Sequence, residues 1–125
     1  MKNFTITDNI LLSNLNRQFL FHKNDIGENS SKSFYAKREA LKINKNLNIN
    51  DYQLLINDST RHIFNDEFFE KQNLVVSAVD NMSARKYIDK LYTFYNKIFI
   101  NSGTQGTNAN SDIYIIQTQL FALTI

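Results

Sequence analysis

The chain has 125 residues, of which 42% are hydrophobic and 13% aromatic, enough to bury one core but too few for a second. Its 14 basic residues nearly balance its 12 acidic ones, so no field of one sign predicts binding to nucleic acid or to an anionic membrane. The absence of cysteine excludes disulfides, thiolate metal ligands and thiol nucleophiles within these residues. Because its apolar stretches are short, we expect a soluble intracellular protein, cytoplasmic or nuclear, without a signal peptide or membrane span.

The first half of the chain predicts a strand, a loop, a helix and a second strand. Phe4–Thr7 alternates aromatic or β-branched residues with short polar ones, which is typical of a short strand. The polar block Asn24–Ser33 predicts a loop that ends at a helix N-cap. A helix from about Ser33 to Asn46 should follow, and Asn48–Leu55 is expected to form the second strand. The apolar residues along one face of that helix are Ala36, Ala40, Ile43 and Leu47.

The second half continues the same alternation. The compact apolar run Leu74–Val79 is typical of a strand buried on both faces of a parallel sheet. Ser83 can cap a helix that reaches about Tyr95 and has apolar residues at spacings of three and four. The remaining predictions are a strand at Ile98–Ile100, a loop at Ser102–Asn110 and a final strand at Ile113–Ile116.

This alternation predicts an α/β fold that is Rossmann-like, with a mostly parallel sheet and helices on both of its faces. In such sheets a ligand binds outside the carboxyl ends of the strands. We therefore expect Asp8, Asp80 and the loop beginning at Asn101 to converge.

The segment Ser13–Phe21, SNLNRQFLF, places amides and one guanidinium before an aromatic and aliphatic anchor. Arg17 offers a fork of donors for phosphate oxygens, and Asn14 and Gln18 add neutral donors. Phe19–Phe21 would pin the segment to the core. The alternative interpretation is an ordinary surface turn with a hydrophobic plug.

Two further positions could serve a nucleotide. Asp80 directly follows the buried strand, where a carboxylate can hold Mg²⁺, and Asn81 adjoins it. The alternative is that Asp80 and Asn81 are turn and N-cap residues. Lys32 could reach phosphates at the N-terminus of the first helix, or be a solvated lysine in a polar loop.

The glycine content is low for a nucleotide-binding protein. Ser102–Thr107, SGTQGT, lacks the lysine and the spacing of a phosphate-binding Walker motif, and no G-x-G-x-x-G is present. We interpret SGTQGT as a tight loop. His22 and His62 have no metal-ligand spacing and are expected to be surface or packing residues.

Taken together, SNLNRQFLF, the following Asp25–Gly27, AVDN at Ala78–Asn81, Ala84–Arg85 and SGTQGT resemble the ubiquitin-activating enzyme family in order and spacing. SNLNRQFLF is specific to the adenylation domain of these enzymes. The resemblance runs from about Phe4 to Ile116, so residues 1–125 are expected to be part of a ThiF-type adenylation domain.

The resemblance implies that this domain binds ATP and Mg²⁺ and adenylates the C-terminal glycine of ubiquitin or a ubiquitin-like protein. It also implies a downstream conjugating enzyme and, in some members, a second adenylation-like half as partners. Carried over to this chain, the phosphate contacts fall to Asn14, Arg17 and Gln18. Asp80 would act with Mg²⁺ and the adenylate, beside Asn81. Arg17 and Asp80 are thus the expected catalytic residues.

The sequence departs from the family pattern at two positions. The family has an Asp-x-Asp pair whose first member binds the ribose. Without gaps in the alignment, Asp8 matches the second member and Ile6 stands in place of the first. A deletion of two residues would instead make Asp8 the ribose ligand. The phosphate-contacting lysine falls at Ser30 by strict count, with Lys32 just after it. The family's glycine-rich loop is expected before Met1, and its cysteine and ubiquitin-fold domains after Ile125.

Three interpretations of function therefore stand. The first is the central piece of a catalytic adenylation domain that is competent only in the full-length enzyme. The second is a degenerate remnant that acts as a binding or scaffold module. The third, a bacterial-type sulfur-carrier adenylyltransferase, shares the chemistry but fits Phe19–Phe21 less well.

Overall fold

The computed structural model describes residues 1–105 and 108–115. The chain divides into two compact units, Met1–Leu55 and Ile56–Ile125. Each unit is described by itself.

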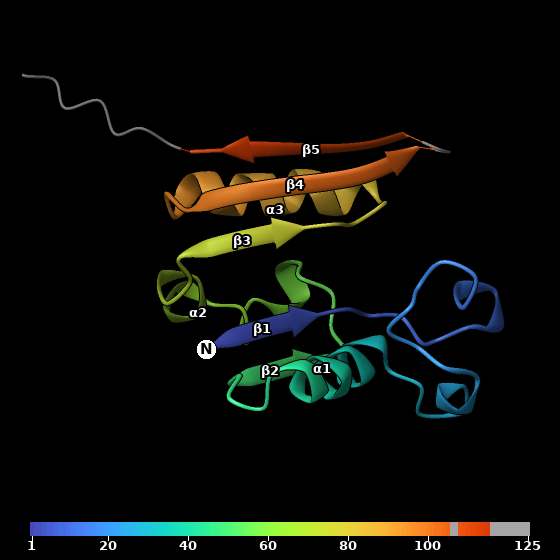
Figure 1. Cartoon of the computed structure of the whole chain (residues 1–125). Coiled ribbons are helices and arrows are strands. Elements are labelled where there is room, and N and C mark those ends of the chain that lie inside the picture. Colours follow the sequence, from blue (N-terminus) through green and yellow to red (C-terminus); the bar gives the residue numbers. More distant parts are fainter. Residues whose placement is uncertain (106–107, 116–125) are drawn as a thin grey trace, which may run out of the picture. The chain divides into compact units, whose positions relative to one another are not determined.

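The first unit is built on two parallel strands joined through a helix (Figure 1). Strand β1 spans Lys2–Thr5 and pairs with β2, Ile49–Tyr52, in parallel. Helix α1, Lys32–Ile43, lies between them in the sequence and packs against both strands. The short 3₁₀ turns η1, Leu12–Asn14, and η2, Lys23–Asp25, occupy the connection from β1 to α1. The predicted strand–loop–helix–strand order is confirmed in this unit.

Helix α1 begins earlier and ends earlier than its apolar pattern indicated. The Ser31 hydroxyl caps it by accepting a hydrogen bond from the Phe34 amide at 3.4 Å. The helix ends at Asn44, whose side-chain Oδ1 accepts a hydrogen bond from the Asn46 amide at 3.0 Å. An asparagine side chain that bonds nearby backbone in this way competes with the helical ladder. Consequently Ile43 lies at the helix end, 81% exposed, rather than on a buried face.

The core of this unit holds α1 against the segment that follows β1. Its buried residues are Ile10, Phe21 and Ala36. The partly buried side chains that pack against them are Phe4, Ile6, Leu15, Leu20 and Tyr35. The predicted anchor is therefore confirmed for Leu20 and Phe21 but wrong for Phe19, which is 85% exposed.

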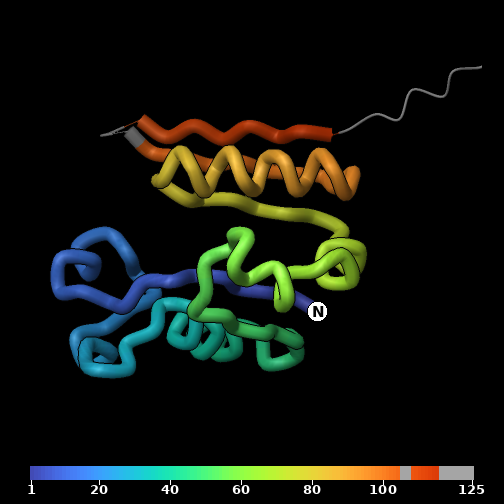
Figure 2. Tube along the Cα trace, turned by 180° about the vertical axis from the view of Figure 1, so that it is seen from behind, coloured from blue at the N-terminus to red at the C-terminus, as the bar shows by residue number. Residues whose placement is uncertain are grey.

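The second unit contains a sheet in the order β3-β4-β5 with α3 along one face (Figures 1 and 2). Strand β3, Leu74–Ser77, pairs in parallel with β4, Ile98–Gln105, and α3, Met82–Phe94, connects them. Strand β5, Asn108–Tyr114, is antiparallel to β4. Before β3, the chain forms the 3₁₀ turn η3, Asp58–Thr60, and the short helix α2, Asp66–Glu70, which the sequence did not predict.

The predicted loop at Ser102–Asn110 is wrong, because β4 and β5 run through most of it as a hairpin. Strand β4 continues to Gln105 and β5 starts at Asn108, with Ser102 opposite Ser111. Phe99 of β4 pairs with Tyr114 of β5 at the apolar end of the hairpin, and this pairing sets the register of the two strands. The polar residues farther along both strands pair in the same register. Gly106, Thr107 and Ile116 lie outside the described residues.

Aromatic stacking fixes α3 on the sheet. The rings of Tyr92 on α3 and Phe99 on β4 are parallel, with centroids 4.0 Å apart, and both residues are buried. Strand β3 is not buried on both faces as predicted, since Leu74 and Val76 are 46% and 62% exposed. The alternating pattern matches a strand with one face toward α3. Tyr95, the C-cap residue of α3, stacks on Phe69 of α2, with the two ring centroids 4.9 Å apart.

Candidate functional site

The SNLNRQFLF segment forms a turn that Asn14 holds together. Asn14 is 6% exposed. Its side-chain Oδ1 accepts a hydrogen bond from the Leu11 amide at 3.0 Å, and its carbonyl accepts from the amides of Arg17 and Gln18 at 3.1 and 2.9 Å. The Oδ1 atom is therefore committed to the turn, and Nδ2 is the donor that Asn14 could offer a ligand.

Arg17 projects from this turn with its charge uncompensated. Its Nη1 donates to the Ser13 carbonyl at 3.0 Å and to Asn16 Oδ1 at 3.1 Å. The side chain is exposed, and within the described part of the chain it has no carboxylate partner. A guanidinium has five N–H donors, so several remain for an anion. The backbone contact orients the group while leaving it available.

Gln18 carries an unsatisfied buried atom. Its Oε1 is buried and has no hydrogen-bond partner among the described residues. Such an atom is costly unless water or a ligand satisfies it. This atom is an acceptor, so a water molecule or a hydroxyl group can satisfy it but a phosphate oxygen cannot. The anion-binding capacity of the segment therefore rests on the exposed Arg17.

Asp8 and Lys32, which the sequence analysis treated separately, lie side by side. The Lys32 amide donates to the Asp8 carbonyl at 3.0 Å, and Lys32 Nζ lies 3.6 Å from Asp8 Oδ2. The bridge between Asn9 and Ser31 continues this contact. The lysine side chain is 12% exposed and the aspartate 71%. Lys32 is the first residue of α1 rather than a residue before it, so both charges stand at the helix N-terminus.

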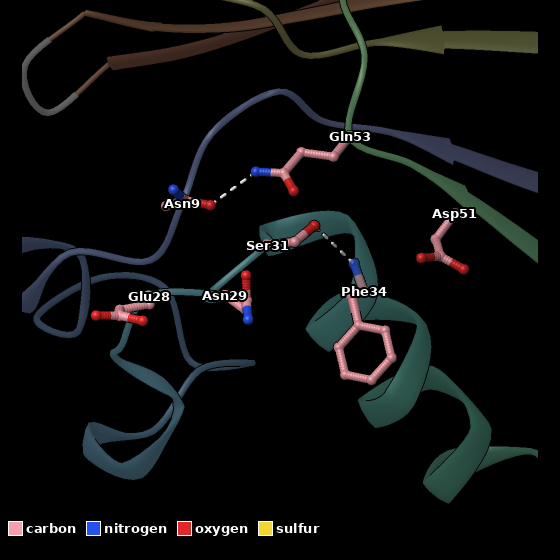
Figure 3. Close-up of a pocket in the computed structure, with 7 residues that line it drawn as sticks. All are labelled: Asn9, Glu28, Asn29, Ser31, Phe34, Asp51 and Gln53. Atoms are coloured by element: carbon pink, nitrogen blue, oxygen red, sulfur yellow. Dashed lines mark hydrogen bonds between the residues drawn. The ribbon is translucent and has the colours of Figure 1, made fainter.

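A cavity of about 390 Å³ opens where β1 and β2 end (Figure 3). Gln53, directly after β2, donates to Asn9 Oδ1 at 2.7 Å and to the Thr7 carbonyl at 3.3 Å, which ties the two strand ends together. The sequence analysis missed Gln53, because an isolated glutamine carries no motif. The lining residues are Asn9, Glu28, Asn29, Ser31, Phe34, Asp51 and Gln53. The cavity thus combines polar side chains with an apolar wall at Phe34, and it lies at the carboxyl ends of parallel strands, where ligands bind in this class of sheet.

In the second unit, Asp80 and Asn81 have different environments. The sequence left open whether they bind a ligand or form the turn and the helix N-cap. Asn81 is the N-cap of α3, with its Oδ1 accepting from the amides of Ser83 and Ala84 at 2.8 and 3.2 Å. Asp80 is exposed, and its carboxylate has no partner in the part of the chain that the structure describes. Capping is therefore confirmed for Asn81, and Asp80 is left available to a ligand.

The donor set at Asp80 suits Mg²⁺ better than a cation that needs a protein cage. Among the described residues no three His, Cys, Asp or Glu side chains group into a metal site. Mg²⁺ is usually held by one or two carboxylates together with phosphate oxygens and water. A single exposed carboxylate after a strand fits that pattern.

The predicted convergence of three strand ends is only partly described. Asp8 belongs to the first unit and Asp80 to the second, so their meeting stays a prediction. Asn101 does not begin a loop as expected, since it lies within β4, paired with Ser77 and Asp112. Its Oδ1 is buried without a partner among the described residues. His22 and His62 are exposed, in agreement with the prediction for them.

Two parallel β-α-β connections, with polar side chains after their strands, define a Rossmann-like α/β protein, and similar solved structures confirm this class. The chain belongs to the ThiF family, which it matches over residues 1–122. The resemblance that SNLNRQFLF indicated is therefore confirmed.

Individual relatives agree with this assignment. The chain is 39% identical over 111 residues to "Ubiquitin-activating enzyme E1 1" of Schizosaccharomyces pombe, which covers 89% of this chain and 11% of that protein. It is 38% identical over 115 residues to "Ubiquitin-like modifier-activating enzyme 6" of Mus musculus, covering 90% and 11%. The chain thus spans about a tenth of the length of these relatives.

The similarity extends to solved structures. The crystal structure of E. coli MccB with ATP superposes with a TM-score of 0.75 at 26% identity, covering 91% of this chain and 33% of MccB. The complex of MccB with MccA-N7isoASN gives the same TM-score, with 91% and 32% covered.

Among the described residues, no helix is long and apolar enough to cross a membrane.

Proposed function

We propose that this chain is part of an adenylation domain, spanning residues 1–125, of an enzyme that activates ubiquitin or a ubiquitin-like protein with ATP and Mg²⁺. The observation that carries the proposal is Arg17, an exposed guanidinium without a carboxylate partner among the described residues. It lies in SNLNRQFLF, the segment that resembles the ubiquitin-activating enzyme family, and the chain is 39% and 38% identical to the two ubiquitin-activating and ubiquitin-like modifier-activating relatives. The similar crystal structure of E. coli MccB with ATP supports the choice of nucleotide.

The described residues have distinct tasks in this proposal. ATP supplies the adenylyl group, and pyrophosphate leaves. Arg17, Gln18 and the Nδ2 of Asn14 donate hydrogen bonds to phosphate oxygens, and Lys32 adds a positive charge at the N-terminus of α1. Asp80 holds Mg²⁺. Because these donors are fixed before the ligand arrives, catalysis rests on positioning and on stabilising the charge that develops on phosphate.

In this proposal Asp8 is the ribose ligand, and the environments of Ile6 and Asp8 support that choice. Ile6 packs against the buried cluster of Ile10, Phe21 and Ala36, so an acidic side chain could not replace it cheaply. The Asp8 carboxylate is 71% exposed and keeps acceptor sites beyond its pair with Lys32. We therefore assign hydrogen bonding to the ribose hydroxyls to Asp8.

The product of this chemistry needs further partners. The chain has no cysteine, so transfer of the activated carboxyl group to a thiol requires a cysteine of another domain or protein. Ubiquitin or a ubiquitin-like protein is the proposed substrate and a conjugating enzyme the proposed acceptor further along. A second adenylation-like half is a further proposed partner, and the cytoplasm or nucleus is the proposed location.

The test is ATP–pyrophosphate exchange by the protein expressed from its complete reading frame, with a panel of ubiquitin-like proteins. Arg17→Ala should lower kcat/KM by about a hundredfold to a thousandfold, the cost of removing one preorganised donor. Lys23→Ala removes an exposed cation of the same unit and should stay within about twofold of the wild type. Unchanged exchange in Arg17→Ala would sink the assignment.

The same experiment addresses the alternative of a non-catalytic remnant. A remnant would show no exchange with any member of the panel and would not bind Mg-ATP in the complete protein. Micromolar binding of Mg-ATP without exchange would instead indicate that the nucleotide site is intact and that the substrate is missing from the panel.

A further inference from the structure

Arg85 on α3 bridges two strands at the point where their own pairing ends. The parallel ladder between β3 and β4 stops at the pair of Ser77 and Asn101. Beyond it, Arg85 Nε donates to the Val79 carbonyl at 2.5 Å and Nη2 donates to the Ser102 carbonyl at 3.2 Å. One side chain thus replaces the missing backbone bonds between the two chain segments.

The guanidinium is committed to this bridge. Arg85 is partly buried and forms no ion pair with any described residue. Hydrogen bonds from a charged donor to carbonyls are stronger than neutral ones. Loss of these two carbonyls would leave the partly buried guanidinium with fewer protein partners, at a cost in stability.

Gly103 provides the space for this arrangement. A Cβ at position 103 would lie 2.6 Å from Arg85 Nη2 and 3.0 Å from Nη1, well inside van der Waals contact. Any larger residue there would push the guanidinium away from the Ser102 carbonyl. Gly103 in SGTQGT therefore leaves room for the Arg85 guanidinium. The sequence alone did not predict this role.

Asp80 lies between two fixed neighbours. Arg85 holds Val79 on one side through its carbonyl, and the N-cap contacts of Asn81 hold the other side. The Arg85 amide also donates to the Asn81 carbonyl at 3.0 Å. The backbone around Asp80 is thus tied to β4 and to α3, while its carboxylate has no partner within residues 1–105 and 108–115.

We propose that Arg85, admitted by Gly103, is a positioning residue that sets the place of the Asp80 carboxylate for Mg²⁺. This inference rests on the proposed function. It concerns the backbone that carries Asp80 rather than a contact of Arg85 with the nucleotide.

The first experiment measures the Mg²⁺ dependence of ATP–pyrophosphate exchange in the protein from its complete reading frame. Arg85→Ala and Gly103→Ala should each raise the Mg²⁺ concentration at half-maximal exchange by about tenfold, the size expected when hydrogen bonds from a charged donor are lost. Arg85→Lys can reach one carbonyl and should recover part of the effect. Lys86→Ala removes the neighbouring exposed charge of α3 and should leave the Mg²⁺ dependence as in the wild type.

The second experiment needs no activity. Amide hydrogen exchange is followed in the absence of nucleotide at Ser83, Ala84 and Arg85, whose amides donate to Asn81, and there Gly103→Ala should speed exchange by about tenfold over wild type and Lys86→Ala should not. If Arg85→Ala fails to fold, Gly103→Ala and Arg85→Lys still carry both measurements.

The outcomes separate this inference from the proposed function. Wild-type exchange that Arg17→Ala lowers by about a hundredfold or more, together with unchanged Mg²⁺ dependence in Arg85→Ala and Gly103→Ala, overturns the positioning role and leaves the function standing. Unchanged hydrogen exchange at the amides of residues 83–85 overturns the bridge itself. A wild-type protein without exchange activity overturns the function and with it the link from Arg85 to Mg²⁺.

Discussion

Removal of Asp25 should destabilise the first unit, because this carboxylate is the buried centre of a small network. Asp25 lies in η2 and is 5% exposed. Its Oδ2 accepts a hydrogen bond from the His22 amide at 2.8 Å, and its Oδ1 accepts one from Arg38 Nη2 at 2.8 Å. Arg38 belongs to α1, so Asp25 ties the loop after SNLNRQFLF to the helix.

The size of the effect follows from these two contacts. A hydrogen bond to a charged group contributes about 1.5–3 kcal/mol. The Arg38 side chain is 36% exposed and also pairs with Glu39, so solvent screens part of its attraction to Asp25. We therefore expect Asp25→Ala to lower the free energy of unfolding by about 2–3 kcal/mol, and Asp25→Asn, which keeps a neutral acceptor, by about half of that.

Urea denaturation followed by circular dichroism measures this change. Glu28→Ala removes an exposed carboxylate of the same loop and should change the stability by less than about 0.5 kcal/mol. An Asp25→Ala protein within that margin of the wild type would refute the argument, since it would mean that the two contacts contribute nothing.

The same network predicts a pH dependence. Burial raises the pKa of Asp25, but the hydrogen bonds from the His22 amide and Arg38, with the Arg38 charge, outweigh it and hold the pKa below its ordinary value. A carboxyl group with a lowered pKa in the folded state stabilises the protein above its unfolded-state pKa and loses that contribution as pH falls. The difference between wild type and Asp25→Asn should be constant near neutral pH and shrink below about pH 4.

Three further predictions concern the second unit. Asn81→Ala removes the N-cap of α3 and should cost about 1 kcal/mol in a urea titration, with Asn81→Ser close to the wild type. The hydrogen bond to Asp66 and burial raise the pKa of Tyr95, and burial also raises the pKa values of Tyr87 and Tyr92. Near-ultraviolet titration should therefore show tyrosines ionising above the ordinary value of about 10, and Tyr95→Phe should lower the amplitude of that step by one tyrosine. Phe99→Ala removes the buried ring that stacks on Tyr92 and leaves a cavity, so it should lower the free energy of unfolding by about 3–5 kcal/mol.

The sequence predicted the elements whose pattern is local. The apolar spacing of α3 and the compact run at β3 identify themselves over a few residues, and the structure places both within two or three residues of the expected bounds. Helix α1 was predicted too long because Leu47 continues the apolar period beyond Ile43, where the helix ends. The competing hydrogen bond made by the Asn44 side chain ends the helix there, and spacing does not reveal that bond.

The hairpin of β4 and β5 could not be read from local signals. Seven of the nine residues of Ser102–Asn110 are Ser, Thr, Asn or Gly, and these residues favour turns when considered alone. Pairing in the apolar part, with Ile100 opposite Ile113, imposes the strand conformation on the polar residues beyond it. Strand preference depends on the partner strand more than on the residue itself. Helix α2 is short, and only the burial of Phe69 and an Asn65 cap define it.

The candidate site shows the same division between chemistry and folding. Sequence places Asn14 and Asn81 beside Arg17 and Asp80 as equal candidates, since all four can bind polar ligands. In the structure, the carbonyl oxygens of both asparagine side chains hold backbone amides, at Leu11 and at the start of α3.

Arg17 and Asp80 are the members of that group whose charges the described fold leaves uncompensated. A motif of this kind is specific because the amides build the turn that presents the charge, and neither part suffices alone. Substitution of Asn14 should therefore impair nucleotide binding through the shape of the turn, and a loss of stability should accompany it. Substitution of Arg17 should impair chemistry with the fold intact, so parallel measurements of unfolding and exchange would separate the two roles.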